Sequence, residues 1–320
     1  MTVATAVERA KRAIAPAVAD VLAEQNSRLA PSPARDANLA ALRRGAAAVV
    51  TGQQVGLFLG PLYTIYKAAT AVVLARAWSR ETGSPVVPVF WLQTEDHDIV
   101  EIASCAIPGE RLDVPVDAEN RISIAQLTLP DAIADCLDRL AELLGPGDDA
   151  AVHVARLGRH YKPGARWADA FAGVLAELFA PEGLVVIDPR DPGFGPFAAP
   201  VHARALDDSS RIASALIARG AELSGHKVHV RPGAPLSFFH PAGACGPRVR
   251  LEPVGPGRFA EVGGGPTHEL AELHAALAAD PLSFSTSALL RPILQDTLLP
   301  TAAYVGGPAE IAYLAQLPPL

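Results

Sequence analysis

The stretch 86-VVPVFWLQTEDHDIVEI-102 joins an apolar run to a cluster of charges. Its first seven residues are β-branched, aromatic or aliphatic, and only Pro88 interrupts them. Such a run predicts a strand that is buried on both faces of a sheet. A charged group at the end of a buried strand needs water, a ligand or a polar network. The charged residues here are Glu95, Asp96, His97 and Asp98.

The neighbouring segments predict that this strand belongs to a parallel sheet. Residues 46–54 are typical of a strand that runs into a polar loop, and residues 61–81 are typical of a helix that has Gly83 as its C-cap. A crossover of this length can join two parallel strands. The alternation continues along the chain, which predicts a doubly wound, mostly parallel α/β sheet. The later elements are a helix at 166–180, a strand at 183–190, a helix at 198–220 and a strand–turn–helix unit at 302–317.

Two stretches interrupt this alternation and predict insertions into the core. Residues 103–165 hold weak strand patterns and an amphipathic helix at 131–145. Residues 225–265 alternate and are rich in Gly and Pro, which is typical of β-hairpins. We expect Thr267 to be the N-cap of the helix that follows. The predicted segments are 1–102 (first half of the core with an N-terminal helix), 103–165 (first insertion), 166–224 (core continued), 225–265 (second insertion) and 266–320 (end of the core).

The two ends of the chain carry further signals. Pro16 predicts a break in the N-terminal helix, and residues 26–37 are typical of a linker. The sequence ends at Leu320, directly after an apolar helical pattern and without a polar tail. We therefore expect the natural protein to continue beyond this point.

Composition narrows the classes of function. The 320 residues carry a net charge of −7 with no Lys/Arg-rich run, which argues against a nucleic-acid partner. The three cysteines are far apart and form no CxxC pair, so we expect a reducing, cytoplasmic setting. One uncharged stretch, Gly45–Tyr66, is long enough to cross a bilayer, but its four glycines and Pro61 predict strand, loop and helix instead. We expect no membrane partner.

Three predicted strands end in unusual loops. In open parallel sheets, ligands bind at the carboxyl ends of the strands. We expect loops 51–54, 95–98 and 306–308 to share one edge of the sheet, and this convergence predicts a binding site. Gly60 and Pro61 predict a helix start that favours an anion, to which Lys67 adds charge and near which Tyr63 lies. The alternative is a surface lysine and a tyrosine that packs on the sheet.

The charged cluster allows three interpretations. In the first, His97 transfers a proton in catalysis, and a neighbouring carboxylate orients its imidazole ring. Alternatively, Asp96, His97 and Asp98 bind a metal ion. In the third, the loop is solvated, and Asp98 or Glu95 caps the next helix.

The C-terminal region adds a second group of candidates. Arg291 and Gln295 lie on one side of a predicted helix, where the guanidinium binds a carboxylate or phosphate or forms a surface salt bridge. Gly306 and Gly307 let a ligand approach the backbone closely. Glu310 lies in the first turn of the last helix.

Three blocks of sequence resemble one known family. The blocks 51-TGQQVGLFLGPLYTIYKA-68, 86-VVPVFWLQTEDHDIVEI-102 and 287-SALLRPILQDTLLPTAAYVGGPAEIAYLAQL-317 resemble the bacillithiol biosynthesis cysteine-adding enzymes, the cysteine ligases. The resemblance implies a Rossmann-like core similar to nucleotidylyltransferases and class I aminoacyl-tRNA synthetases, with connecting insertions. It also implies a C-terminal coiled coil that forms homodimers, which is missing here.

The resemblance implies a reaction that joins cysteine to the amino group of glucosaminyl-malate. It makes ATP the natural activating cosubstrate, although the HxGH signature of the synthetases is absent, and no metal is expected. We expect Asp96 or His97 to orient or deprotonate the amine. The alternative hypotheses are a metal-dependent hydrolase that uses Asp96, His97 and Asp98, and a truncated, non-catalytic remnant. Residues that match the family's blocks and are expected to bind substrate or nucleotide are Gln53, Gln54, Gly60, Tyr63, Lys67, Glu95, Asp98, Arg291, Gln295, Gly306, Gly307 and Glu310.

Overall fold

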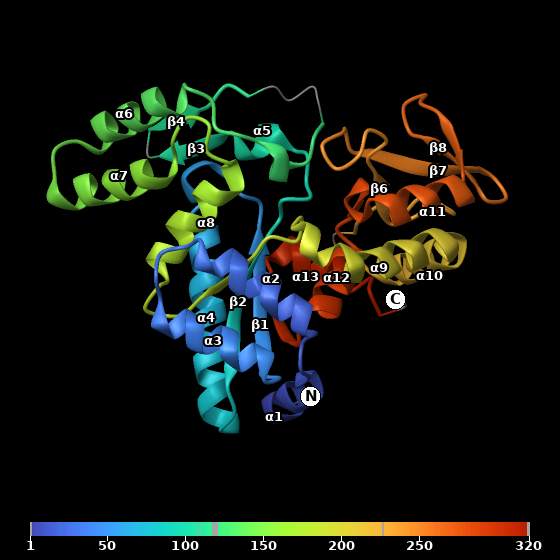
Figure 1. Cartoon of the computed structure of the whole chain (residues 1–320), viewed down its shortest axis with the longest axis horizontal. Coiled ribbons are helices and arrows are strands. Elements are labelled where there is room, and N and C mark those ends of the chain that lie inside the picture. Colours follow the sequence, from blue (N-terminus) through green and yellow to red (C-terminus); the bar gives the residue numbers. More distant parts are fainter. Residues whose placement is uncertain (1, 108, 117–120, 226, 319–320) are drawn as a thin grey trace. The chain divides into compact units, whose positions relative to one another are not determined.

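Four parallel strands form the central sheet. The computed structural model describes residues 2–107, 109–116, 121–225 and 227–318. The strand order is β11-β1-β2-β5, and each neighbouring pair is parallel. Figure 1 shows β1 and β2 side by side among helices. The predicted, mostly parallel α/β sheet is therefore confirmed. The strands are β1 (Ala47–Gln53), β2 (Val86–Leu92), β5 (Val185–Ile187) and β11 (Thr301–Val305).

Strand β2 is buried along its whole length. Its successive side chains point to opposite faces, so helices must cover both faces of the sheet. On one face, Phe90 packs in a cluster with Val72 and Phe171, which come from two helices. The first of these helices is the crossover, and it ends at Gly83, whose φ of 65° provides the predicted left-handed C-cap. The helices are α4 (Tyr63–Thr82) and α8 (Trp167–Leu178).

Side-chain amides cover the outer edge of β5. Asn26 donates to Val186 O (2.8 Å) and accepts from Val186 N (3.0 Å). Gln25 makes the same pair of bonds to the backbone of Asp188, at 3.0 and 2.9 Å. The amides occupy the position of a further strand, and they close an edge that would otherwise pair with another chain. Both residues lie on α2 (Pro16–Ser27).

The N-terminal region is more helical than the sequence pattern indicates. Pro16 begins α2, so the predicted break is confirmed. The predicted linker 26–37 is wrong at both ends, because α2 extends to Ser27 and α3 begins at Pro33, where the Ser32 hydroxyl accepts from Arg35 N (3.1 Å). A Ser N-cap followed by Pro is a strong helix start, and it outweighs the loop-like composition. The other helices are α1 (Val3–Ala10) and α3 (Pro33–Arg43).

Residues between β2 and α8 form a small α/β insertion. A hairpin of two short strands follows a single helical turn, and two helices come next. The second of these helices has no fully buried residue, but its Val154 and Leu157 are partly buried and pack against the core. The elements are α5 (Ile99–Ile102), β3 (Ser104–Ile107), β4 (Glu110–Asp113), the 3₁₀ turn η2 (Ile124–Gln126), α6 (Ile133–Leu144) and α7 (Asp148–His160).

A second sheet is antiparallel and has the order β10-β6-β7-β8-β9. The β-hairpins predicted from the Gly/Pro-rich stretch are confirmed in β7 and β8. The predicted helix 198–220 is two helices, because the chain turns at Asp208 (φ −97°, ψ 14°). The elements are α9 (Gly195–Asp207), α10 (Ser209–Glu222), β6 (Ser237–Phe239), β7 (Val249–Gly255), β8 (Arg258–Glu261), β9 (Thr267–Glu269), α11 (Leu270–Ala279), β10 (Phe284–Thr286), α12 (Arg291–Leu298) and α13 (Pro308–Leu314).

Thr267 is not the N-cap of α11. Its backbone pairs with Ala260 in the second sheet, so the helix starts at Leu270 instead. The side chain of Glu272 accepts from Glu269 N (2.8 Å) and satisfies one amide at the helix start. Pairing with the preceding strand β8 therefore outweighs the local capping preference of threonine.

Contacts divide the chain into two units. The first holds Met1–Arg190 and Pro300–Val305, and the second holds Asp191–Leu299 and Gly306–Leu320. The predicted core segment 166–224 thus lies partly in each unit. Among the described residues, no helix is both long and apolar enough to pass through a lipid bilayer.

Candidate functional site

Polar loops meet at the carboxyl edge of the parallel sheet. Gln53 pairs with Leu92 at the ends of β1 and β2, so the loops that follow start side by side. The Gln54 amide donates to Asp96 Oδ2 at 2.9 Å. The structure therefore brings together the first and second predicted loops. Thr51 pairs with Val305, the last residue of β11. Gly306 and Gly307 are the next residues in the chain and belong to the second unit.

Lys67 carries a buried positive charge beside this edge. Its side chain reaches from α4 to the end of β1, where Nζ donates to Gly52 O (2.5 Å) and to Gln53 Oε1 (3.2 Å). The residue is 3% exposed, and Nζ lies 5.4 Å from the Tyr63 ring centroid and 6.0 Å from that of Tyr304. The alternative of a surface lysine is therefore wrong. Two aromatic faces and two oxygens stabilise the ammonium group.

The loop between β1 and α4 is tightly folded. Gly56 and Gly60 approach so closely that a Cβ on Gly56 would lie 2.7 Å from Gly60 Cα. Phe58 and Leu59 have φ values of 51° and 76°, which are unusual for residues with side chains. The loop includes the 3₁₀ turn η1 (Leu57–Leu59).

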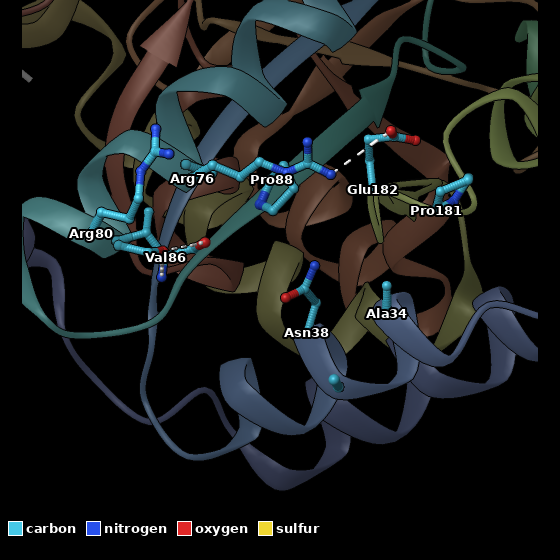
Figure 2. Close-up of a pocket in the computed structure, with 11 residues that line it drawn as sticks. Ala34, Asn38, Arg76, Arg80, Val86, Pro88, Pro181 and Glu182 are labelled. Carbon is cyan, nitrogen blue, oxygen red and sulfur yellow. Dashed lines mark hydrogen bonds and ion pairs between the residues drawn. The ribbon is translucent and has the colours of Figure 1, made fainter.

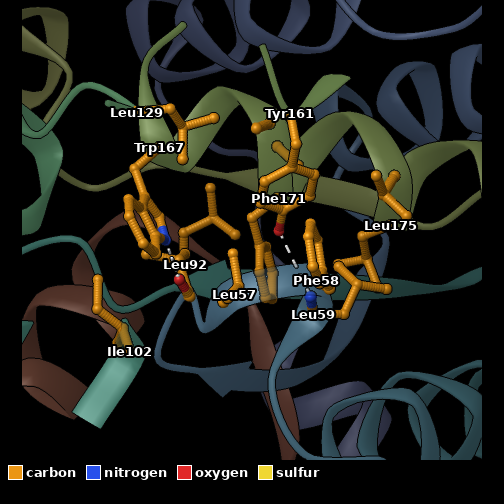
Figure 3. Packing of buried hydrophobic residues seen from close by; sticks show 14 of the residues in the cluster. Leu57, Phe58, Leu59, Leu92, Ile102, Leu129, Tyr161, Trp167, Phe171 and Leu175 are labelled. Carbon is orange, nitrogen blue, oxygen red and sulfur yellow. Dashed lines mark hydrogen bonds between the residues drawn. The ribbon is translucent and has the colours of Figure 1, made fainter. Parts of the chain in front are cut away.

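Aromatic residues of the insertion and α8 hold this loop in place. The Tyr161 hydroxyl accepts from Leu59 N (3.4 Å), and the Tyr161 ring packs edge-on against Phe58 (5.0 Å between centroids). Trp167 Nε1 donates to Val55 O (2.6 Å). Figure 3 shows these rings gathered around the turn. The surrounding core thus stabilises a backbone that is strained by itself.

The helix start differs from the predicted one. The sequence pattern places Pro61 in the first helical position, but α4 begins at Tyr63. Gly60 is in the left-handed region, and its N–H donates to Leu57 O (2.8 Å). That amide is therefore already bound within the turn, and the predicted anion site at Gly60 loses one of its donors.

The charged cluster is ordered by its own side chains. Asp96 Oδ1 accepts from His97 N (2.8 Å) and lies 3.4 Å from His97 Nδ1. Arg121 Nη2 lies 3.2 Å from His97 Nε2. The side chains of Asp96 and His97 are 31% and 23% exposed, so solvent and small molecules can reach them. A carboxylate beside an imidazole is a geometry that can orient a nucleophile or accept a proton.

The other two acids of the cluster have different surroundings. Asp98 caps α5 by accepting from Glu101 N (3.2 Å), as the helix-cap interpretation predicts. Glu95 is buried. Within the described ranges, no group of three or more His, Cys, Asp and Glu side chains could hold a metal ion. No cluster of metal-binding side chains among the described residues therefore supports the hypothesis of a metal-dependent hydrolase.

Asp188 belongs to the same edge, although it was not among the predicted site residues. It follows β5 directly, and its Oδ1 accepts from Thr94 Oγ1 at 2.5 Å and from Arg190 N at 3.0 Å. Arg166 Nη2 lies 3.6 Å from Oδ2. Burial raises the pKa of the Asp188 carboxyl, and the Thr94 hydrogen bond opposes this shift. The sequence signal was an acid at the end of a strand, the same signal that drew attention to Glu95.

The C-terminal candidates lie in the second unit. Arg291 and Gln295 are buried on α12, and Arg291 Nη1 donates to Gln295 Oε1 (2.8 Å), so the surface salt bridge is wrong. Glu310 Oε2 accepts from Gly307 N (2.8 Å) and thereby caps α13. Burial raises the pKa of Tyr313, and the nearby Arg291 charge opposes the shift. A joint role for these residues and the first-unit edge stays a prediction.

A separate pocket lies at the opposite end of β2. It has a volume of about 510 Å³ and is lined by Val86, Pro88, Asn38 and the arginines 76 and 80 of α4 (Figure 2). Arg76 forms a long ion pair with Glu182 (3.8 Å). None of the predicted site residues lines this pocket, which is therefore distinct from the carboxyl edge.

Comparisons with known proteins agree on one family. A family model described as "Bacillithiol biosynthesis BshC, N-terminal Rossmann-like domain" matches residues 2–320. The chain is 41% identical over 314 residues to the "Putative cysteine ligase BshC" of Koribacter versatilis, covering 93% of this chain and 56% of that protein. The protein of the same name from Salinibacter ruber is 38% identical over 306 residues, with coverages of 93% and 56%. The chain spans about half the length of these curated relatives.

Proposed function

The chain belongs to the bacillithiol biosynthesis BshC family, and from that premise we propose that it supplies the substrate-binding sheet edge of a cysteine ligase. The proposed reaction forms an amide bond between the carboxyl group of cysteine and the amine of glucosaminyl-malate. The observation that carries this proposal is the contact between Gln54 and Asp96, which joins two polar loops at the carboxyl ends of β1 and β2.

The charges at this edge suit the proposed substrates. Glucosaminyl-malate offers two carboxylates, hydroxyl groups and an amine. The buried ammonium of Lys67 provides positive potential close to the end of β1. The Asp96 carboxylate provides a negative group for the amine, beside His97. One cation and one acid–imidazole pair would complement a substrate that carries both negative and positive groups.

The chemical step requires a neutral amine. An ammonium group has no lone pair, so it must lose a proton before its nitrogen attacks the carbonyl carbon of activated cysteine and displaces the activating group. We propose that Asp96 or His97 accepts this proton, because the two residues are adjacent and partly exposed to solvent. The positive charge of Lys67 orients a substrate carboxylate near these groups.

The activating cosubstrate stays a proposal. ATP, if bound, would supply the energy that converts the cysteine carboxylate into an acylating group. The glycines of the loop after β1 do not form an open set of phosphate donors, because Gly56 N and Gly60 N donate to Gln54 O and Leu57 O. We therefore derive no step through ATP.

Substitution of the acid–imidazole pair tests the proposed function. We expect D96A and H97A each to lower turnover in an assay of thiol formation from cysteine and glucosaminyl-malate by about a hundredfold or more, the usual contribution of general acid–base catalysis. E101Q is the matched control, because Glu101 is an exposed acid on the following turn. Wild-type turnover in both D96A and H97A would contradict the assignment.

A further inference from the structure

Asp188 connects three segments that are far apart in the sequence. Its carboxylate accepts from the Thr94 hydroxyl, which lies two residues before Asp96. Its second oxygen faces Arg166, whose guanidinium also donates to Ala125 O at 3.1 Å. The end of β5, the turn after β2 and the start of α8 therefore meet at one carboxyl group, and Arg166 links this group to the 3₁₀ turn η2.

The backbone carbonyl groups of the turn after β2 accept further hydrogen bonds from residues 123–125. Thr94 O accepts from Ser123 Oγ (2.6 Å) and from Ala125 N (3.0 Å). Asp96 O accepts from Ile124 N (2.8 Å). Thr94 and Ser123 are fully buried. The backbone that carries Asp96 thus has a buried network of hydrogen bonds on the side away from solvent.

We propose that Asp188 is a positioning residue, which acts through Thr94 to hold Asp96 and His97 in their reactive arrangement. This inference rests on the proposed function for its effect on turnover. Asp188 accepts the hydrogen bond from Thr94, two residues before Asp96, so its influence on Asp96 and His97 passes through the turn that begins at Thr94.

The placement of a carboxyl group here argues against a purely structural role. A largely buried carboxylate, 15% exposed in its side chain, costs free energy on folding unless hydrogen bonds offset that cost. An amide side chain would fill the same space without the cost of burying a charge. The carboxylate does accept a short hydrogen bond from Thr94, and charge-assisted bonds of this kind restrict geometry more strongly than neutral ones.

A pair of threonine variants tests the connection. T94V removes the hydroxyl and keeps the shape, whereas T94S keeps the hydroxyl. We expect T94V and D188N to lower kcat by about tenfold to a hundredfold, with KM changed less than about threefold, because small displacements near the reacting atoms cost this much. We expect T94S to restore most of kcat. The double variant T94V/D188N should lose no more than the worse single variant, because T94V removes the bond between Thr94 and residue 188, and D188N replaces its charged acceptor with a neutral amide oxygen.

A hydroxyl at the other end of β2 provides the control. Ser79 Oγ accepts from Val86 N (2.9 Å), so S79A removes a hydrogen bond of similar kind away from the site. We expect its kcat to match that of the wild type. An equal loss of kcat in T94S and T94V, or wild-type kcat in both T94V and D188N, would overturn the proposal.

Amide hydrogen exchange separates this inference from the proposed function. Ile124 N and Ala125 N donate to Asp96 O and Thr94 O, so their exchange reports on the turn directly. We expect both amides to exchange at least about tenfold faster in T94V and D188N, while Val186 N, which is bonded to Asn26, stays unchanged. If the wild-type protein formed no thiol, the proposed function would fail and the exchange rates would still decide the positioning role. Unchanged exchange at Ile124 and Ala125 would contradict it.

Discussion

Two acids at the sheet edge follow the same rule, Asp96 after β2 and Asp188 after β5. Asp96 could be predicted as a site candidate because an acid after a buried apolar run has no apolar explanation. Asp188 follows the same rule, but its strand is short and the Pro189 that follows suggests an ordinary turn. Only the pairing of β2 with β5 reveals that Asp188 lies next to the turn at Thr94. Information of this kind is long-range, so no local pattern contains it.

The raised pKa of Asp188 predicts how the free energy of unfolding depends on pH. Burial raises the pKa of its carboxyl in the folded protein. The folded state therefore binds this proton more tightly than the unfolded state, whose carboxyl titrates near about 4. The contribution of Asp188 to the free energy of unfolding is present at lower pH and decreases as the pH rises from about 4 through the folded-state pKa.

D188N removes this titration. We expect the free energy of unfolding of D188N, relative to the wild type, to increase between pH 4 and pH 7, as measured by urea denaturation at several pH values. Combined with a loss of kcat, this result would show that the carboxylate serves the site at the expense of stability. A relative decrease over the same range would contradict the direction of the pKa shift.

At the scale of elements, prediction succeeded where the pattern was local and periodic. The crossover helix, its Gly83 cap and the hairpins of the second sheet follow from apolar spacing and turn residues. The helix start at Pro61 was wrong because the turn at Leu57–Leu59 depends on packing against Tyr161 and Trp167. Those residues lie about a hundred positions away, beyond any window of sequence.

The contact between Gly56 and Gly60 tests how this turn is held. We expect G56A to lower the free energy of unfolding by about 1–3 kcal/mol, because its Cβ would meet the Gly60 backbone at 2.7 Å. The matched control is G158A on α7, where a Cβ meets nothing within 4 Å, and it should be neutral or stabilising by about 1 kcal/mol. Urea denaturation compares the two variants, and equal stabilities would contradict the packing argument.

At the scale of the whole molecule, the first unit is discontinuous in sequence. Residues Pro300–Val305 return to it after Asp191–Leu299 of the second unit, and β11 pairs with β1. The alternation of strands and helices predicted a parallel sheet, but it did not predict which strand lies beside β1. Strand order depends on the packing of segments about 250 residues apart. That is why the sheet could be predicted and the division of the chain into two units could not.

The central claim is that a polar substrate binds at the carboxyl edge formed by the loops after β1 and β2. Amide hydrogen exchange of the protein, with and without glucosaminyl-malate, tests it most directly. The account predicts slower exchange at residues 52–54 and 94–98 on addition of the ligand, and no change around Arg76 and Arg80, which line the pocket at the other end of β2. Slower exchange around those arginines, with residues 52–54 and 94–98 unchanged, would contradict the account.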